Sequence, residues 1–281
     1  MTELGDFLRA CRDGLPPAEA GIPVYGRRRV PGLRREEVAD LAGVSVDYVV
    51  RLEQGRVAGA SRAVLVALAH ALRLRPDEEA YLLRSVTTAG TGRAAGEAPV
   101  RPVSPATRLL LDSVAGVPAL VLGRRMDVLA WNTLGAALFT DFGRVPPERR
   151  NHVRLAFLDP EVRSRYADWD RVARECVAYL RMEAGRYPDD PRLDGLVREL
   201  SAADPDFGKW WGSHQVAAQN RGRKRFVHPY AGELTLDFQV FDVRGDPAPE
   251  QMLVVYTAEP GSRSAEALTF LASWAGIPAS R

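Results

Sequence analysis

The sequence predicts a protein of two domains, an all-α domain over residues 1–86 and an α+β domain with an antiparallel sheet over residues 104–281. Three observations support this fold class. Apolar residues recur at helical spacing through the first 86 residues, whereas near the end of the chain they alternate with polar residues at period two, as in half-buried strands. Between these parts, residues 87–103 are rich in Gly, Ala, Pro and Thr and lack apolar periodicity. They are therefore predicted to form a flexible linker.

Five helices are predicted in the first domain. The first begins with Thr2 as a cap and runs to Cys11, and a loop rich in Pro and Gly follows from Gly14 to Gly32. The other four are expected at residues 34–42, 45–54 and 61–72 and from Asp77 onward. Five helices in about 85 residues can form a small independent core.

The second and third of these helices have the features of a helix-turn-helix. Gly43 stands where a helix usually ends on a left-handed residue, which glycine adopts without steric cost. Ser45 is a good N-cap for the next helix, and Val44 can pack on Val49 beside it. The start of such a recognition helix reaches base edges in the major groove of DNA. An ordinary helical hairpin is the alternative, but spacing, glycine and cap together favour the helix-turn-helix.

The residues expected to contact bases lie on the outer side of the recognition helix. Arg51 is the best single candidate, because Arg is the usual partner of guanine O6 and N7; an ion pair with Asp47 or Glu53 is the alternative. Asp47 could repel phosphate or accept a hydrogen bond from cytosine, or simply favour the helix dipole as an acid in the first turn. Glu53 is expected to be structural. The full predicted set is Ser45, Val46, Asp47, Tyr48 and Arg51.

Arginines cluster just before this motif. The run RRRVPGLRR, residues 27–35, holds five arginines and no acid. Arginine binds phosphate bidentately and releases condensed counterions, which raises affinity without reading sequence. A solvated loop is the alternative, but the run leads directly into the motif, where phosphate contacts are expected. The predicted phosphate-contacting residues are Arg27, Arg28, Arg29, Arg34 and Arg35.

The second domain is predicted to begin at Ser104–Pro105, with Pro at the first position of a helix. Two short strands joined by a turn at residues 123–127 precede Asn132, which can cap the next helix. This order of strand, turn, strand, Asn and short helix is typical of the opening of PAS-type sensor folds, which enclose a pocket. The predicted helices are 107–114, 133–139, 162–166, 169–184, 191–202 and 265–274, and the predicted strands lie within 119–131 and at 226–228, 234–241 and 252–257.

Aromatic residues of this domain could line an apolar ligand cavity. Asn132 and His228 could be its few polar orienting groups. For each aromatic residue, packing in an ordinary core is the alternative. The candidates are Trp131, Phe139, Phe157, Trp169, Trp211 and Phe238.

The amino-acid composition indicates the general class of protein and its compartment. Apolar residues make up 46% of the 281 residues, charged residues 26%, and the formal net charge is +2, as in ordinary globular proteins. The chain lacks an apolar run long enough to span a bilayer, and its N-terminus lacks the apolar centre of a signal peptide. We therefore expect a cytoplasmic protein without a membrane partner. Cys11 and Cys176 are expected to be buried thiols in a reducing compartment.

Enzymatic motifs are absent from the sequence. It contains no HExxH, CxxC, GxGxxG, GxxxxGK[ST] or GxSxG, and its four histidines are scattered. We expect no catalytic residues, no metal site and no cofactor. A haem- or flavin-binding sensor is the alternative, and haem would need Cys176 or a histidine as its ligand.

The run from Leu33 to Gly55 resembles the Cro/repressor-like, XRE-type helix-turn-helix. The resemblance implies that Val46, Asp47 and Arg51 face bases, and that Arg35 stands where the family often carries a phosphate-contacting Gln. The phrases that carry it are Glu36-Glu37-Val38-Ala39, Gly43-Val44-Ser45, Tyr48 and Arg51-Leu52-Glu53-Gln54-Gly55.

The second half resembles the C-terminal domain of MmyB-like transcription regulators, a PAS-like ligand-binding module found behind such a helix-turn-helix. The resemblance implies a one-component regulator that binds double-stranded operator DNA as a homodimer and is controlled by a small apolar ligand, with a fatty acid as one candidate. In a second interpretation, the C-terminal domain serves only dimerisation or partner recruitment. The matching phrases are Pro118-Ala119, Asp127-Val128-Leu129-Ala130-Trp131-Asn132, Arg150-Asn151, Trp169, Leu180-Arg181, Trp211, His228-Pro229, Gly232-Glu233-Leu234 and Tyr256-Thr257-Ala258.

Overall fold

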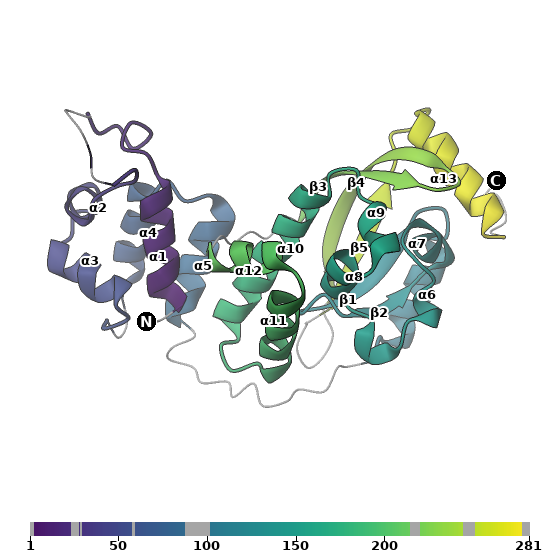
Figure 1. The fold of residues 1–281 in the computed structure, drawn as a ribbon, viewed down its shortest axis with the longest axis horizontal. Helices are drawn as coiled ribbons and strands as arrows, with labels where there is room; N and C mark the ends of the chain where they lie inside the picture. Colours follow the sequence, from purple (N-terminus) through teal and green to yellow (C-terminus); the bar gives the residue numbers. More distant parts are fainter. Residues whose placement is uncertain are drawn as a thin grey trace. The chain divides into compact units, whose positions relative to one another are not determined.

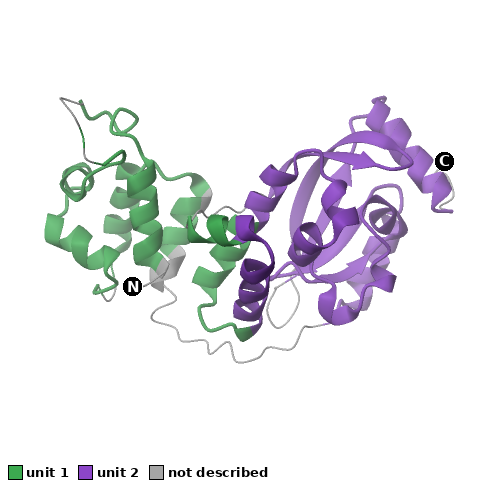
Figure 2. Ribbon diagram, in the orientation of Figure 1, with its two compact units in different colours: residues 1–96, 177–191, 208–218 green, residues 97–176, 192–207, 219–281 purple. Residues whose placement is uncertain are grey.

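The computed structural model describes residues 3–23, 28, 30–57, 60–87, 102–213, 220–243 and 251–276. The chain divides into two compact units (Figure 2). Unit 1 comprises residues 1–96, 177–191 and 208–218, and unit 2 comprises residues 97–176, 192–207 and 219–281. The predicted boundaries placed every residue after the linker in one domain. The structure instead assigns two later segments, 177–191 and 208–218, to unit 1.

Unit 1 contains the predicted all-α domain of five helices (Figure 1). Its core includes Phe7, Leu33, Leu68 and Leu82, all at most 1% exposed. The rings of Phe7 and Tyr81 meet edge to face with centroids 4.7 Å apart, a favourable aromatic geometry. The helices are α1 (Glu3–Gly14), α2 (Arg35–Ala42), α3 (Val46–Glu53), α4 (Arg62–Ala71) and α5 (Pro76–Thr87).

A later helix, α10 (Trp169–Arg186), also contributes to this core. Tyr179 packs against the apolar cluster of unit 1, and Met182 is part of it. Gly185 lies against Tyr81 so closely that a Cβ there would come within 2.3 Å of the Tyr81 ring. Residues 177–191 therefore belong to unit 1 through packing between side chains distant in sequence.

A glycine also sets the spacing of α1 and α3. A Cβ on Gly5 would lie 2.1 Å from the backbone oxygen of Glu53. No real Cβ approaches a carbonyl oxygen so closely, so the two helices can touch here only because residue 5 lacks a side chain.

The turn between α2 and α3 forms as predicted. Gly43 has φ of +65° in the left-handed region and ends α2, while the Val44 N–H donates to the Ala39 carbonyl at 3.0 Å. The Ser45 hydroxyl accepts from the Tyr48 backbone N–H at 3.1 Å and caps α3. These local contacts confirm the predicted helix-turn-helix geometry.

Unit 2 has the predicted α+β fold with an antiparallel sheet. The strands are β1 (Ala119–Gly123), β2 (Val128–Trp131), β3 (Arg221–His228), β4 (Gly232–Val243) and β5 (Gln251–Thr257), in the order β2-β1-β5-β4-β3. Helices wholly within it are α6 (Pro105–Ser113), α7 (Thr133–Leu138), α8 (His152–Leu158), α9 (Pro160–Ser164) and α13 (Arg263–Trp274), and α11 (Pro191–Ala203) belongs to it from Arg192 onward. Short 3-10 turns are η1 (Phe142–Arg144) and η2 (Pro147–Arg149), and α12 (Pro205–Gly212), like α10, contributes to both units.

The two faces of the sheet are both covered. On one face, Val121, Ala130 and Leu253 pack with Leu111 of α6 in a small apolar cluster. The register pairs Phe238 with Tyr256, which belong to the opposite face, where the aromatic core lies. Coverage on both sides explains why every residue of β1 is buried.

The predicted elements of unit 2 differ from the structure at strand β3 and in the helices between β2 and β3. The prediction placed the strand at residues 226–228, whereas β3 begins at Arg221. The charged run before Phe226 concealed a period-two pattern, because Arg223 and Arg225 face outward and Lys224 faces inward. Helices α8 and α12 were also absent from the prediction.

Helices that could cross a membrane were sought in the described residues, and none combines sufficient length with sufficient apolar character.

Candidate DNA-binding helix and ligand-binding interior

The outer face of α3 presents most of the predicted base-contacting residues. Ser45, Val46 and Asp47 are exposed, and so is Arg51 one turn further on. Tyr48 is half-buried and packs against the core of unit 1. The accessible part of this face is therefore the helix start and the Arg51 side, as the helix-turn-helix geometry requires.

Arg51 pairs with Asp47 across one turn of α3. Its Nε donates to Asp47 Oδ2 at 2.9 Å, and the two side chains are 51% and 73% exposed. The alternative partner, Glu53, faces the interior and is 2% exposed. Exposed ion pairs contribute little free energy, so the pair orients the guanidinium without withdrawing it from a binding partner.

Glu53 instead joins three elements of unit 1. One carboxylate oxygen accepts from Arg12 Nε at 2.7 Å, and the other accepts from Arg35 Nε at 2.9 Å. Arg12 also donates through Nη1 to the Leu33 carbonyl at 2.9 Å. This network ties α1, the start of α2 and the end of α3, which holds the recognition helix in place.

Two of the predicted phosphate-contacting arginines are engaged inside unit 1. Arg28 makes a bidentate pair with Glu37, both contacts at 2.7 Å, and its side chain is 15% exposed. This pairing raises the pKa of Arg28 and lowers the pKa of Glu37. Arg35 is bound by Glu53. The acids that hold them lie later in the sequence, so the arginine run alone did not reveal the pairs.

The other three predicted phosphate contacts differ in what the structure describes. Arg34 is exposed at the N-cap of α2, a position from which it can reach a phosphate. Arg27 and Arg29 lie outside the described residues.

Asn132 is not free to orient a ligand, contrary to one expectation. Its Oδ1 accepts from the backbone N–H groups of Ala119 and Gly135 at 3.1 and 2.8 Å, which caps α7. Its Nδ2 donates to the carbonyls of Val114 and Val117 at 3.1 and 2.7 Å. Four internal hydrogen bonds use the whole amide, so Asn132 fixes the fold.

His228 is likewise engaged within unit 2. Its Nε2 donates to the Ala137 carbonyl at 2.9 Å, and its Nδ1 accepts from the N–H groups of Tyr230 and Ala231. Burial lowers the pKa of His228, which favours this neutral tautomer.

The predicted pocket aromatics fall into separate groups. Phe139 lies at the centre of the first, with ring centroids 5.4 Å from Tyr256 and 5.5 Å from Phe226. Trp131 adjoins it through Phe142, and Phe238 adjoins it through Tyr256. The cluster of Phe139, Phe142, Phe226, Phe238, Tyr166, Tyr256, Trp131 and His152 is called the aromatic interior below.

The remaining three candidates lie elsewhere. Phe157 and Trp169 pack with Phe207 in a second group, with ring centroids 5.2–5.5 Å apart. Trp211 belongs to unit 1, where the guanidinium of Arg181 stacks 4.4 Å from its ring. These residues could not be assigned to separate groups before the fold was known, because the aromatic residue type alone does not report position.

The aromatic interior also contains polar groups that were not predicted from the sequence. The Tyr166 hydroxyl and His152 Nε2 are 3.0 Å apart, and both side chains are buried. Burial lowers the pKa of His152 to about 3, so the ring is neutral and accepts from the tyrosine. Lys224 enters the same region from β3 and is 7% exposed. Lys224, Phe226 and His228 occupy every second position of the strand, and this spacing could have predicted that Lys224 faces inward.

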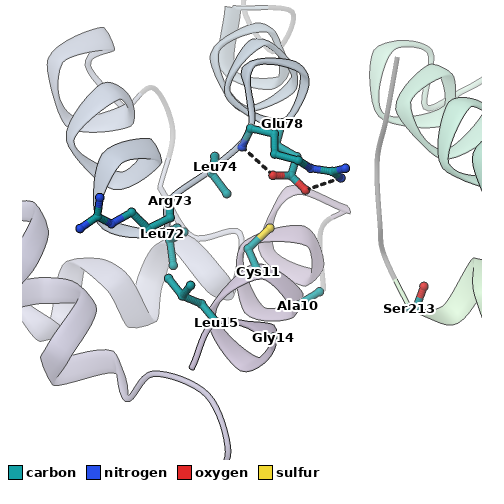
Figure 3. A pocket seen from close by; sticks show the side chains of 10 residues that line it. Ala10, Cys11, Gly14, Leu15, Leu72, Arg73, Leu74, Glu78 and Ser213 are labelled. Atoms are coloured by element: carbon teal, nitrogen blue, oxygen red, sulfur yellow. Dashed lines mark hydrogen bonds and ion pairs between the residues drawn. The ribbon is translucent and has the colours of Figure 1, made fainter. Parts of the chain in front are cut away.

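A cavity of about 430 Å³ lies in unit 1, away from every predicted pocket residue (Figure 3). The side chains of Cys11, Leu15 and Leu74 line it, together with Arg75 and Glu78, which form an ion pair. Burial raises the pKa of the Cys11 thiol, which therefore stays protonated and unreactive.

A search for metal sites found no group of three or more His, Cys, Asp or Glu side chains suitably arranged within the described ranges.

Two family models match the chain. The model of the MmyB-like transcription regulator ligand binding domain matches residues 103–271, which is more than half of the chain. A helix-turn-helix domain model matches residues 3–82. A search of curated proteins gave no match.

Proposed function

The chain belongs to the family of MmyB-like transcription regulators, and from this premise we propose that it is a one-component regulator in which a small apolar ligand controls binding to an operator. DNA binding is the activity of the helix-turn-helix, and ligand binding is that of unit 2. We also propose that the protein acts as a homodimer and that ligand binding in unit 2 controls DNA binding by unit 1.

The observation that carries the DNA-binding role is the exposed outer face of α3. Val46 is 38% exposed although it is apolar, and the Arg51 side chain is 51% exposed. An apolar side chain at the start of a recognition helix can contact the thymine methyl group, while arginine binds guanine. The face therefore suits the major groove of a duplex.

Control by a ligand would operate as a population shift. A ligand that binds one dimer geometry better than another moves the recognition helices on or off half-sites one helical turn apart. Helix α10 supports such coupling, because its residues through Cys176 belong to unit 2 and those from Val177 belong to unit 1. We propose that a ligand-induced shift of the unit 2 part of α10 reaches unit 1 through this helix.

The proposed ligand is a small apolar molecule, and a fatty acid is one candidate. The aromatic interior supports an apolar ligand class, because pockets for such molecules are lined by aromatic and aliphatic side chains. Purified chain extracted with organic solvent and examined by mass spectrometry should yield such a molecule if it is retained.

The test of the whole proposal is DNA binding by the full chain with and without that extract. Fluorescence anisotropy should show tighter binding to the upstream region of its own gene than to scrambled DNA of equal length. Added extract should change the affinity for the upstream region alone. Equal affinity for both DNAs at every salt concentration would refute sequence-specific regulation.

A second candidate function keeps DNA binding but gives unit 2 only a role in dimerisation or partner recruitment. The internal hydrogen bonds of Asn132 and His228 favour it, because they leave these two groups without a task toward a ligand. Native mass spectrometry separates the two candidates. A dimer without bound small molecule, unaffected by added extract, would support the second.

A further inference from the structure

Lys224 occupies an apolar position on the inner face of the sheet. Along β3, Lys224, Phe226 and His228 point inward and are 7%, 1% and 2% exposed. The outward residues Arg223 and Arg225 are paired at the surface with Asp237 and Asp168. The sheet thus carries one ammonium group into the interior of unit 2, at a place where a leucine would fit the pattern.

The ammonium group is only loosely paired there. The nearest carboxylate oxygen, Glu175 Oε2 of α10, lies 3.8 Å from Nζ, beyond hydrogen-bond distance. Glu175 accepts a shorter hydrogen bond, 3.0 Å, from Arg171. Within the part of the chain that the structure describes, Nζ donates no hydrogen bond. A buried ammonium normally obtains close oxygen partners, because losing its water is costly.

Aromatic rings make up much of the remaining surroundings of Nζ. The group lies 4.9 Å from the Phe238 ring centroid and 6.0 Å from that of Tyr166. Such contacts favour a cation but do not replace hydrogen bonds.

Other titratable groups facing this region are uncharged at neutral pH. The pKa of His152 is lowered, and the pKa values of Tyr166, Tyr256 and Cys176 are raised, in each case chiefly by burial. Glu175 is therefore the only described counter-charge beside Lys224.

We propose that Lys224 binds the anionic group of an otherwise apolar ligand held in the aromatic interior. The inference rests on the proposed function, because it assumes that unit 2 binds a small apolar molecule. It restricts that molecule to one with an anionic group, as a fatty acid has, and names the residue that recognises this group. The ligand's oxyanion accepts hydrogen bonds from the Lys224 ammonium group, and Glu175 keeps Arg171 as its partner.

Three probes of equal chain length test the sign of the charge. Decanoate, decanol and decylamine are titrated into the full chain after lipid has been removed, and binding is measured by isothermal titration calorimetry at neutral pH. Decanoate should bind at least tenfold more tightly than decanol, and decylamine should bind most weakly. Decanol binding as tightly as decanoate would overturn the inference but leave the proposed function intact.

Failure of the proposed function has a different signature. If none of the three probes binds and the purified chain yields no small molecule, unit 2 is not a site for apolar ligands and both proposals fail.

Two lysine variants test whether Lys224 is the residue that recognises the charge of the ligand. Lys224→Met has similar length and no charge, and it should weaken decanoate binding at least tenfold while decanol binding stays the same or strengthens. Lys209→Met, at the exposed lysine of α12, is the matched control and should leave both affinities unchanged. Equal loss of decanoate and decanol binding in Lys224→Met would overturn a specific role for the charge.

A measurement on the unaltered chain keeps the inference testable if Lys224→Met does not fold. Decanoate carrying a ¹³C label on its carboxyl carbon reports its own protonation by NMR. Pairing with Lys224 should lower the pKa of the bound carboxyl below that of free decanoate. A raised pKa would mean that the carboxyl lies in apolar surroundings away from Lys224, which contradicts the inference.

Discussion

Arg12 of α1 donates a 2.7 Å hydrogen bond to Glu53 at the end of the recognition helix, and both side chains are almost fully buried, at 9% and 2% exposure. A buried carboxylate requires such partners, because unpaired charge is costly in the interior. The position of α3 thus depends on charges that lie behind its exposed outer face.

Removing the Glu53 carboxylate should therefore destabilise unit 1 strongly. Glu53→Ala removes the buried partner of Arg12 and leaves it only the exposed carboxylate of Asp13, and we expect a loss of about 3 kcal/mol in the free energy of unfolding. Chemical denaturation followed by circular dichroism measures this loss. Glu36→Ala, at an exposed acid of α2, is the control and should change stability by less than about 0.5 kcal/mol. A Glu53→Ala chain as stable as the control would refute the structural role of the network.

Adding one methyl group between α1 and α3 should also displace the recognition helix. Gly5→Ala forces the helices apart, because its Cβ would meet the Glu53 carbonyl oxygen. We expect a cost of about 1–3 kcal/mol together with weaker DNA binding. Gly14→Ala, at the end of the same helix, meets nothing within 4 Å and should be neutral or slightly stabilising. Differential scanning calorimetry compares the two, and equal melting temperatures would contradict the close approach.

The ion pairs of unit 1 separate the predicted phosphate contacts into two kinds. Arg34→Ala should weaken binding to all DNA sequences and reduce the slope of log K against log salt by about 1, because one phosphate contact is lost. Arg28→Ala should leave that slope unchanged, since Arg28 is held by Glu37. Anisotropy titrations over a range of KCl concentrations measure both slopes. A flattened slope in Arg28→Ala alone would mean that Arg28 leaves Glu37 to bind phosphate.

Arg51 should determine sequence preference more than overall affinity. Arg51→Ala is expected to reduce discrimination between the operator and variants at one base pair by about 1–3 kcal/mol, because a bidentate base contact is lost. Competition binding with single-base operator variants measures the change. Arg108→Ala, at an exposed arginine of α6, is the control. Unaltered discrimination in Arg51→Ala would place base recognition elsewhere.

Local patterns predicted the elements of this fold well. The helix-turn-helix followed from Gly43, Ser45 and apolar spacing, because caps and turns are determined by neighbouring residues. The strand that begins at Arg221 was recognised only in part, since its charges are neutralised by partners from other elements.

The sites were harder to predict, because their properties arise from residues far apart in the chain. The pairing of Arg35 with Glu53 and the inward orientation of Lys224 depend on the folded arrangement, which residue type does not report. The packing of Tyr179 and Met182 in the core of unit 1 also depends on the folded arrangement. A run of arginines therefore indicated positive charge correctly without showing how much of it remains available.

His152 should make unit 2 sensitive to acid. Burial, with a smaller contribution from the charge of Lys224, lowers the pKa of His152 from 6.5 to about 3. Between these values the unfolded chain binds a proton that the folded chain does not, so stability is complete above pH 6.5 and falls as the pH falls toward 3.

From pH 7 to pH 5 this one group should cost about 2 kcal/mol. His152→Gln, which can still bond to the Tyr166 hydroxyl, should lose that part of the pH dependence, whereas His70→Gln, at an exposed histidine of α4, should retain it. Urea denaturation at the two pH values measures the difference. The same decline in His152→Gln as in the unaltered chain would mean that another group is responsible, such as His228, whose pKa burial also lowers.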